Sequence, residues 1–286
     1  MTHTSLVTCE ELADLLGKVT VLDVRWRLGG PNGHEEYLRG HVPGAAYVDL
    51  ESDLADPPGP RGRHPLPDHA RFAAAMRRCG VSGDRPVVVY DAVGGTSAAR
   101  CWWLLRYHGH RDVRMLDGGW TRWVERGGAV EAGEPSVPAG GFRADPGHLP
   151  VLDAEAAAGV ARDGVLVDAR APERFRGEVE PVDPVAGHIP GAVNVPATGN
   201  LAGAGSPEHG RFLSLDDLDA RYARAGVQGD VAVGVYCGSG VTAAHDVFAL
   251  HLLGREAALY PGSWSEWVTD PERPVETGSG GSRRAD

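Results

Sequence analysis

An internal duplication constrains the fold of this chain more than any other feature of its sequence. Four short blocks of the first half recur in the second half, in the same order and at an offset of about 145 residues. The pairs are residues 21–25 and 166–170, 40–45 and 187–192, 87–91 and 233–237, and 118–123 and 262–267. A length of 286 residues also exceeds the usual size of one domain. The sequence therefore predicts two copies of one fold.

Each copy is expected to alternate strands with helices. Continuous apolar strands between amphipathic helices are typical of a parallel sheet that is covered on both faces. The expected strands are 19–24, 45–49 and 86–91 in the first copy and 164–169, 192–196 and 231–236 in the second, and the longer helices are 68–79, 97–108, 214–225 and 243–253. The sequence thus predicts an α/β fold with two tandem domains, each a central parallel sheet flanked by helices on both faces.

The blocks also suggest where each domain begins and ends. The first copy occupies residues 1–130 and the second 151–275. Residues 131–150, rich in Gly, Pro and Ala and without periodicity, are interpreted as a linker. The tail 276–286 is expected to be disordered.

Charge and composition exclude several classes of protein. A formal net charge of −11 argues against nucleic acid or an anionic membrane as the main partner. No apolar run approaches the roughly 18 residues of a membrane span, and the N-terminus does not resemble a signal peptide. The four cysteines contain no C-x-x-C pair, so neither a zinc motif nor another metal site is predicted. We expect a protein of the reducing cytoplasm.

The loop that follows the strand 231–236 carries the candidate chemistry. Cys237 ends that strand, and Gly238, Ser239, Gly240, Val241 and Thr242 lead into a helix. A loop between a strand and a helix N-terminus turns backbone N–H groups toward one point, and the two glycines supply the positive φ that this curvature requires. Such donors stabilise a thiolate, or a persulfide on the same sulfur. Thr242 is interpreted as the helix N-cap.

The duplication serves as an internal control. A residue present in both copies is expected to serve the fold, whereas one present in a single copy is a candidate for chemistry. Asp91 stands in the first copy where Cys237 stands in the second, so the fold does not require sulfur there. Cys9, Cys79 and Cys101 are interpreted as small buried core residues.

Taken together, the loop from Cys237 to Thr242, the doubled Gly-His-[Val/Ile]-Pro-Gly-Ala block and the Gly-[Gly/Ser]-Trp turns resemble a tandem-domain rhodanese-type sulfurtransferase, from about Leu6 to Val275. The resemblance implies a catalytically inactive first domain and a Cys237 that cycles through a persulfide, without metal or organic cofactor. It also implies that the residues after Cys237, namely Gly238, Gly240, Val241 and Thr242, line the substrate site.

Within that family, the uncharged Gly238 and Ser239 resemble the 3-mercaptopyruvate type more than the thiosulfate type. Arg174 matches the arginine that binds the substrate anion, as a guanidinium fork suits a carboxylate. Val182 stands where the mercaptopyruvate type has a second arginine, so the donor is left open between 3-mercaptopyruvate and thiosulfate.

The resemblance further implies a Ser–His–Asp arrangement that moves protons. Ser239 and His41 match two of its members, and Glu35 or Glu36 would replace the third unless it is absent. His41 recurs as His188, so the internal control favours a structural role for this histidine.

The sequence therefore predicts an enzyme that passes sulfur from a small-molecule donor through Cys237 to cyanide, a small thiol or a thioredoxin-like protein. Thiosulfate:cyanide sulfur transfer as the main activity, and a non-enzymatic scaffold that binds or senses sulfur, are the alternatives. A cysteine phosphatase or arsenate reductase would need an arginine six residues after the cysteine, where this chain has Ala243.

Overall fold

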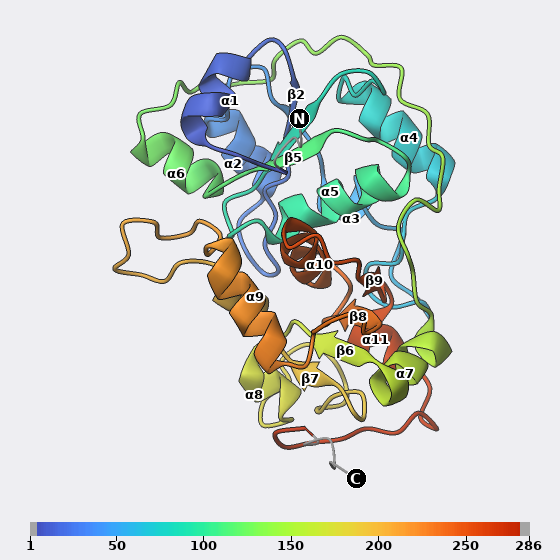
Figure 1. Ribbon diagram of the computed structural model, residues 1–286. Helices are drawn as coiled ribbons and strands as arrows, with labels where there is room; N and C mark the ends of the chain where they lie inside the picture. Colours follow the sequence, from blue (N-terminus) through green and yellow to red (C-terminus); the bar gives the residue numbers. More distant parts are fainter. Residues whose placement is uncertain (1–4, 281–286) are drawn as a thin grey trace. The chain divides into compact units, whose positions relative to one another are not determined.

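The computed structural model describes residues 5–280, and its contacts divide them into two units, which are described separately (Figure 1). Unit 1 comprises residues 5–56, 66–149 and 202–212, and unit 2 comprises residues 57–65, 150–201 and 213–280. Each unit thus contains a short segment that the sequence assigns to the other copy. Residues 57–65 must therefore be considered together with Cys237.

Unit 1 contains a five-stranded parallel sheet in the order β1-β5-β4-β2-β3. Every residue of the central strands β2 and β4 is buried, as their apolar sequences predict. The strands are β1 Leu6–Val7, β2 Thr20–Asp23, β3 Ala46–Tyr47, β4 Val87–Tyr90 and β5 Val113–Leu116. The helices are α1 Cys9–Leu15, α2 Gly33–Arg39, α3 Leu50–Asp53, α4 His69–Arg78, α5 Thr96–Tyr107 and α6 Gly119–Glu125.

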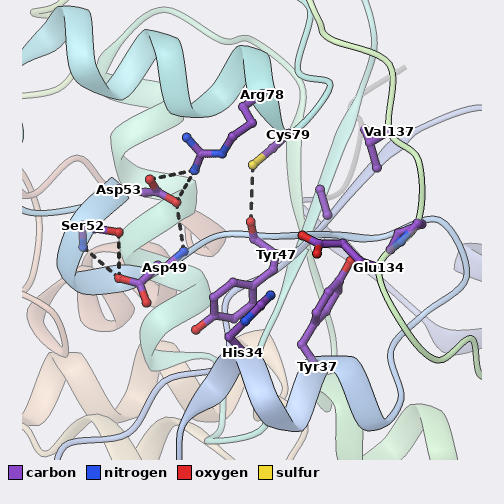
Figure 2. A pocket seen from close by; sticks show the side chains of 12 residues that line it. His34, Tyr37, Tyr47, Asp49, Ser52, Asp53, Arg78, Cys79, Glu134 and Val137 are labelled. Carbon is purple, nitrogen blue, oxygen red and sulfur yellow. Dashed lines mark hydrogen bonds and ion pairs between the residues drawn. The ribbon is translucent and has the colours of Figure 1, made fainter.

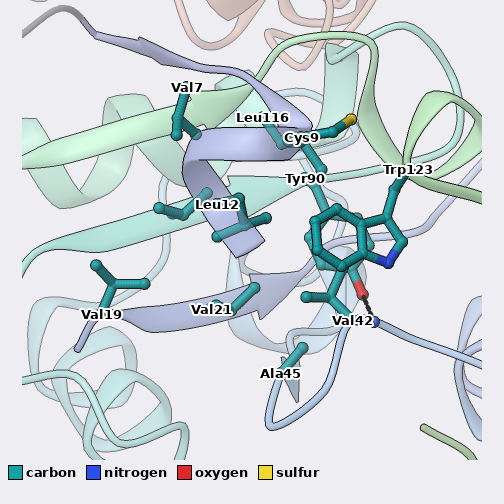
Figure 3. Packing of buried hydrophobic residues seen from close by; sticks show 11 residues of the cluster. Val7, Cys9, Leu12, Val19, Val21, Val42, Ala45, Tyr90, Leu116 and Trp123 are labelled. Carbon is teal, nitrogen blue, oxygen red and sulfur yellow. Dashed lines mark hydrogen bonds between the residues drawn. The ribbon is translucent and has the colours of Figure 1, made fainter. Parts of the chain in front are cut away.

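One face of this sheet forms an apolar core with α1 and α6 (Figure 3). Val21 and Val88 lie in this cluster, whereas their neighbours Leu22 and Val89 do not, because successive side chains of a strand point to opposite faces. Leu12 of α1 and Trp123 of α6 close the cluster. Burial on both faces accounts for the continuous apolar strands.

Unit 2 repeats this architecture with four parallel strands in the order β7-β6-β8-β9. The strands are β6 Val165–Asp168, β7 Val193–Asn194, β8 Val233–Tyr236 and β9 Ala258–Leu259. The helices are α7 Ala154–Asp163, α8 Pro172–Phe175, α9 Leu215–Arg224, α10 Ala243–Leu252 and α11 Ser263–Trp267, with a 3₁₀ turn at Ala197–Asn200. The prediction of two α/β domains with flanking helices is confirmed.

The residues that recur in both copies form the same contacts in both units. Asp168 and Arg170 form a buried ion pair of 2.7 Å, and Arg170 also donates to the carbonyl of Gly187 at 2.7 Å. The Arg170 guanidinium lies 4.8 Å from the centre of the Trp264 ring, a cation–π contact. In unit 1 the corresponding residues are Asp23, Arg25, Gly40 and Trp120. These contacts agree with a structural role for the shared pair.

The two segments outside the repeats make contacts of their own. Of residues 131–150, interpreted as linker, 131–149 belong to unit 1, where Phe142 is only 2% exposed. At the start of the expected tail, Glu276 and His188 form an antiparallel β-bridge. The N–H of Gly278 donates to the carbonyl of Arg176. Residues 281–286 lie outside the described residues. Among residues 5–280, no helix combines the length and the apolarity that a membrane crossing requires.

Candidate active site in unit 2

Cys237 lies at the carboxyl end of β8, in the loop that leads into α10. Its side chain is only 2% exposed. The N–H of Cys237 donates to the hydroxyl of Ser263 at 3.1 Å, and its carbonyl accepts from the N–H of Trp264 at 3.0 Å. The N–H of Gly240 donates to the Cys237 sulfur at 3.2 Å. These hydrogen bonds fix the backbone of Cys237, and the N–H of Gly240 contributes a donor to the sulfur.

The two glycines of this loop have different functions. Gly240 has a φ of +75°, the left-handed conformation that the sequence predicted. Gly238 was expected to share it, and this expectation is wrong, because Gly238 is not among the residues with positive φ. A Cβ on Gly238 would instead lie 2.9 Å from Nη2 of Arg63. The end of the Arg63 side chain thus lies directly beside Gly238.

The equivalent loop of unit 1 shows which kind of group its backbone N–H donors can bind. Asp91 is fully buried, and its carboxylate accepts four backbone N–H groups at 2.8–2.9 Å, from Val93, Gly95, Ser97 and Ala98. Burial raises the pKa of Asp91, and these four hydrogen bonds oppose that shift. In unit 1 the loop thus surrounds a built-in carboxyl group. The same kind of loop in unit 2 surrounds a sulfur.

Ser239 contacts a histidine that the sequence analysis did not single out. The Ser239 hydroxyl lies 2.7 Å from Nδ1 of His64, and each residue is only 8% exposed. His64 belongs to the segment 57–65, which is part of unit 2. The internal control could have found it, since Gly62-Arg63-His64 corresponds to Gly210-Arg211-Phe212 and the histidine is absent from the second copy.

His41, the histidine that the sequence analysis matched to this position, packs inside unit 1. Its ring is fully buried, stacks on Tyr37 at 4.1 Å between centroids, and contacts the Tyr37 carbonyl through Nδ1 at 2.9 Å. His188 of unit 2 stacks on Phe175 and contacts the carbonyl of Phe175 in the same way. Because the two histidines repeat one packing arrangement, we replace His41 by His64 in the candidate site.

Two arginines border the loop. The Cβ position of Gly238 lies 3.5 Å from Nη1 and 3.6 Å from Nη2 of Arg174, in addition to its contact with Arg63. Arg174 donates to Glu180 at 2.6 and 3.2 Å and to Asp183 at 3.3 Å, and Asp183 also pairs with Arg63. Both carboxylate side chains are only 4% exposed. The guanidinium groups therefore lie next to the loop, held by buried carboxylates.

The two carboxylates respond differently to these arginines. Burial alone would raise the pKa of Glu180, but hydrogen bonds from Arg174 and from two backbone N–H groups lower it below its usual range. Burial raises the pKa of Asp183, because the attraction of the arginines and the repulsion from Glu180 leave desolvation dominant. Glu180 is thus the better stabilised of the two anions.

Val241, Thr242 and Val182 are the remaining residues that the sequence analysis discussed. Val241 is buried, and Thr242 is half-buried at the N-cap position of α10. Thr242 is thus the N-cap residue of α10, as the sequence predicted, although its side chain forms no capping hydrogen bond. Val182 is 37% exposed and contributes no charge.

Two pockets lie in unit 1, and neither is lined by residues of the Cys237 loop. One of about 440 Å³ is lined by His34, Tyr37 and Tyr47 together with the thiol of Cys79 (Figure 2). That thiol donates to the Tyr47 carbonyl at 3.4 Å, and burial raises the pKa of Cys79 to about 11. A thiol held protonated in this way is a poor nucleophile. Within residues 5–280, no group of three His, Cys, Asp or Glu side chains is placed to hold a metal ion.

The geometry thus assembles a cysteine with an N–H donor on its sulfur, a hydroxyl–imidazole pair and two guanidinium groups. The model of the rhodanese-like domain matches the chain twice, at residues 8–126 and 152–270. The chain belongs to the family of proteins built from rhodanese-like domains.

The matches to named relatives span nearly the whole chain. The chain is 48% identical over 283 residues to "Putative thiosulfate sulfurtransferase SseB" of Mycobacterium tuberculosis, covering 96% of this chain and 97% of the relative. It is 37% identical over 286 residues to the 3-mercaptopyruvate sulfurtransferase of Escherichia coli, covering 96% and 99%. The crystal structure of SseA from Escherichia coli, described as a 3-mercaptopyruvate sulfotransferase, matches with a TM-score of 0.81 at 36% identity, over 92% of this chain and all of the other. The names of these relatives thus include both thiosulfate and 3-mercaptopyruvate as sulfur donors.

Proposed function

We propose that this protein is a sulfurtransferase that carries sulfur as a persulfide on Cys237. The observation that carries the proposal is the Gly240 N–H on the Cys237 sulfur, in a loop whose unit 1 counterpart encloses the Asp91 carboxyl group. Backbone donors of this kind stabilise the negative charge of a thiolate and of a persulfide. The membership of the rhodanese-like family and the names of the relatives support the same function.

The donor is 3-mercaptopyruvate, with thiosulfate as the alternative. The Cys237 thiolate attacks the mercapto sulfur, forming an S–S bond while the C–S bond breaks and its electron pair stays on carbon as the enolate of pyruvate. A proton then converts the enolate to pyruvate. With thiosulfate, the same attack breaks the S–S bond of the donor and releases sulfite, which needs no proton.

The other residues of the site bind the donor and supply the proton. Arg174 binds the carboxylate of the donor, and the loop residues Gly238, Gly240, Val241 and Thr242 border it. The hydroxyl of Ser239, paired with His64, supplies the proton to the enolate. In the second step cyanide, a small thiol or a thioredoxin-like protein attacks the outer sulfur and regenerates the Cys237 thiolate. Both steps use only this chain and its substrates, and the proposal includes neither a metal nor an organic cofactor.

We further propose that the protein works in a reducing compartment, the cytoplasm. The four cysteines all lie within the described residues and are free, which supports this setting. A persulfide cycle also requires Cys237 to return to the thiolate after each turnover.

The test is to incubate the protein with each donor and to measure its mass. We expect the mass of one sulfur atom to be added, on the peptide that contains Cys237, and cyanide to remove it as thiocyanate. Cys237→Ser should abolish both, whereas Cys9→Ser is the matched control and should retain them. Addition of sulfur to Cys9, Cys79 or Cys101, or turnover by Cys237→Ser, would contradict the mechanism.

A further inference from the structure

Arg63 is a second cation at the loop of Cys237, contributed by a segment that the sequence assigns to the first copy. Gly59 and Gly62 close a tight turn with two backbone hydrogen bonds of 3.0 and 3.1 Å. The N–H of Arg63, the next residue, donates to the hydroxyl of Ser265 at 3.1 Å. The turn and this bond fix the backbone from which the side chain extends to within 2.9 Å of the Gly238 Cβ position.

The corresponding arginine of unit 1 shows what a purely structural role looks like. Arg211 donates from Nε to Asp117 at 2.6 Å and from Nη1 to Glu208 at 2.5 Å. In unit 2 the residue that corresponds to Asp117 is Pro261, which has no carboxylate. Arg63 cannot repeat this contact, although the internal control alone would classify it as structural.

The guanidinium of Arg63 is arranged like one half of an anion-binding pair. Its Nη1 donates to Asp183, whose other oxygen accepts from Arg174 at 3.3 Å, so one carboxylate holds both arginines beside the loop. Nε of Arg63 is buried and, within residues 5–280, has no hydrogen-bond partner. The side chain is 24% exposed, so the group keeps some contact with solvent. A carboxylate bound here would meet planar donors from two guanidinium groups.

We propose that Arg63, together with Arg174, binds the anionic group of the sulfur donor, the carboxylate of 3-mercaptopyruvate, at the Cys237 loop. This inference rests on the proposed sulfurtransferase function and adds a substrate-binding residue to it. It supplies the positive charge that Val182 does not. Arg63 is a binding residue, so it affects the donor step and has no part in the discharge of the persulfide.

The test is to compare Arg63→Gln with Arg61→Gln, a matched control that removes an exposed arginine from the same segment. Loss of one charged hydrogen-bond partner should raise the KM for 3-mercaptopyruvate by roughly 10- to 100-fold, with kcat changed by less than about twofold. Arg63→Lys, which keeps the charge and loses the fork, should lie between the two. Arg61→Gln should keep the wild-type KM.

The rate at which cyanide discharges a preformed persulfide separates binding from a structural effect. It should be the same in Arg63→Gln, loaded at high donor concentration, as in the wild type. An equal loss in both half-reactions, or a KM for Arg63→Gln equal to that of Arg61→Gln, would overturn the role of Arg63 while wild-type turnover stands. Failure of the wild type itself to take up sulfur would instead overturn the proposed function.

Discussion

At the scale of single residues, the hydroxyl–imidazole contact makes a prediction that separates the two donors. His64→Phe puts into unit 2 the residue that the chain has at the corresponding Phe212. Without the imidazole, the enolate loses its proton supply, and turnover of 3-mercaptopyruvate should fall by about 10²-fold or more. Turnover of thiosulfate should change far less, because sulfite leaves without a proton. Steady-state kinetics with both donors on one preparation provide the measurement.

Ser239→Ala provides the control, because it removes the other member of the same pair. It should lower mercaptopyruvate turnover to a similar degree, and the double variant should be little worse than either single one. Equal losses with both donors would show that His64 acts through the structure of the loop and not through a proton.

Residues of the site differed in how far the sequence could predict them. Cys237 ends the recurring block 233–237 and Arg174 follows the block 166–170, so the duplication could assign both residues to the second copy. His64 and Arg63 lie in the Gly- and Pro-rich segment 57–65, which belongs to unit 2. Nothing in its local composition indicates which unit it packs against, because that depends on tertiary contacts. His41 was matched instead through the family resemblance, although its recurrence as His188 already favoured a structural role.

At the scale of elements, the strand–loop–helix unit around Asp91 should depend on its carboxylate. Asp91→Ala would leave four N–H groups without their acceptor, two of them buried (Ser97 and Ala98) and two half-buried. Since an unsatisfied buried group costs about 1–3 kcal/mol, we expect the free energy of unfolding to fall by about 3 kcal/mol or more. Denaturant unfolding of the full chain measures it, with Asp91→Asn, which keeps one acceptor oxygen, as the milder control.

The same loop should not become a second catalytic site. Asp91→Cys in the Cys237→Ser background supplies a thiol, but Phe212 stands where His64 stands, and Glu36 precedes Tyr37 as Arg174 precedes Phe175. Sulfur transfer by this double variant should remain near the background rate. Efficient turnover would contradict the assignment of chemistry to unit 2 alone.

Helix α10, which follows the Cys237 loop, carries a buried acid that should make stability depend on pH. Burial raises the pKa of Asp246 from 3.8 to about 7, against hydrogen bonds that include one of 2.7 Å from Asn200. Between these values the folded chain keeps a proton that the unfolded chain has released. The Asp246 contribution to stability is therefore complete below the lower value and is lost as pH rises through the upper one, at about 1.4 kcal/mol per pH unit.

Asp246→Asn keeps the size of the side chain and an acceptor for Asn200 but cannot ionise. Unfolding free energies measured from pH 4 to pH 8 should fall less steeply in this variant than in the wild type. Parallel pH profiles would show that Asp246 titrates normally in the folded chain.

At the scale of the whole molecule, the duplication predicts the fold of each unit. It does not predict which segments of the chain belong to each unit. Recurring strands and turns predicted both sheets, because burial on two faces leaves a clear apolar pattern in β2, β4, β6 and β8. The assignment of residues 57–65 to unit 2 and of 202–212 to unit 1 leaves no such pattern. Both segments are short and rich in Gly and Pro, so only their tertiary partners determine where they belong.

The charge of the molecule and of its site together predict the preference for a donor. The chain carries a net charge of −11, and the guanidinium groups of Arg63 and Arg174 are balanced by the carboxylates of Glu180 and Asp183. A dianion such as thiosulfate needs more positive charge than this site offers, whereas a monoanionic mercapto acid needs less. We therefore expect a higher kcat/KM for 3-mercaptopyruvate than for thiosulfate. Added salt screens the repulsion between the negatively charged protein and an anionic donor. Because a dianion is repelled more strongly than a monoanion, added salt should raise kcat/KM for thiosulfate by the larger factor. Measuring both donors at two ionic strengths on one preparation checks both statements, and a higher value for thiosulfate at low salt would show that local cations outweigh the total charge.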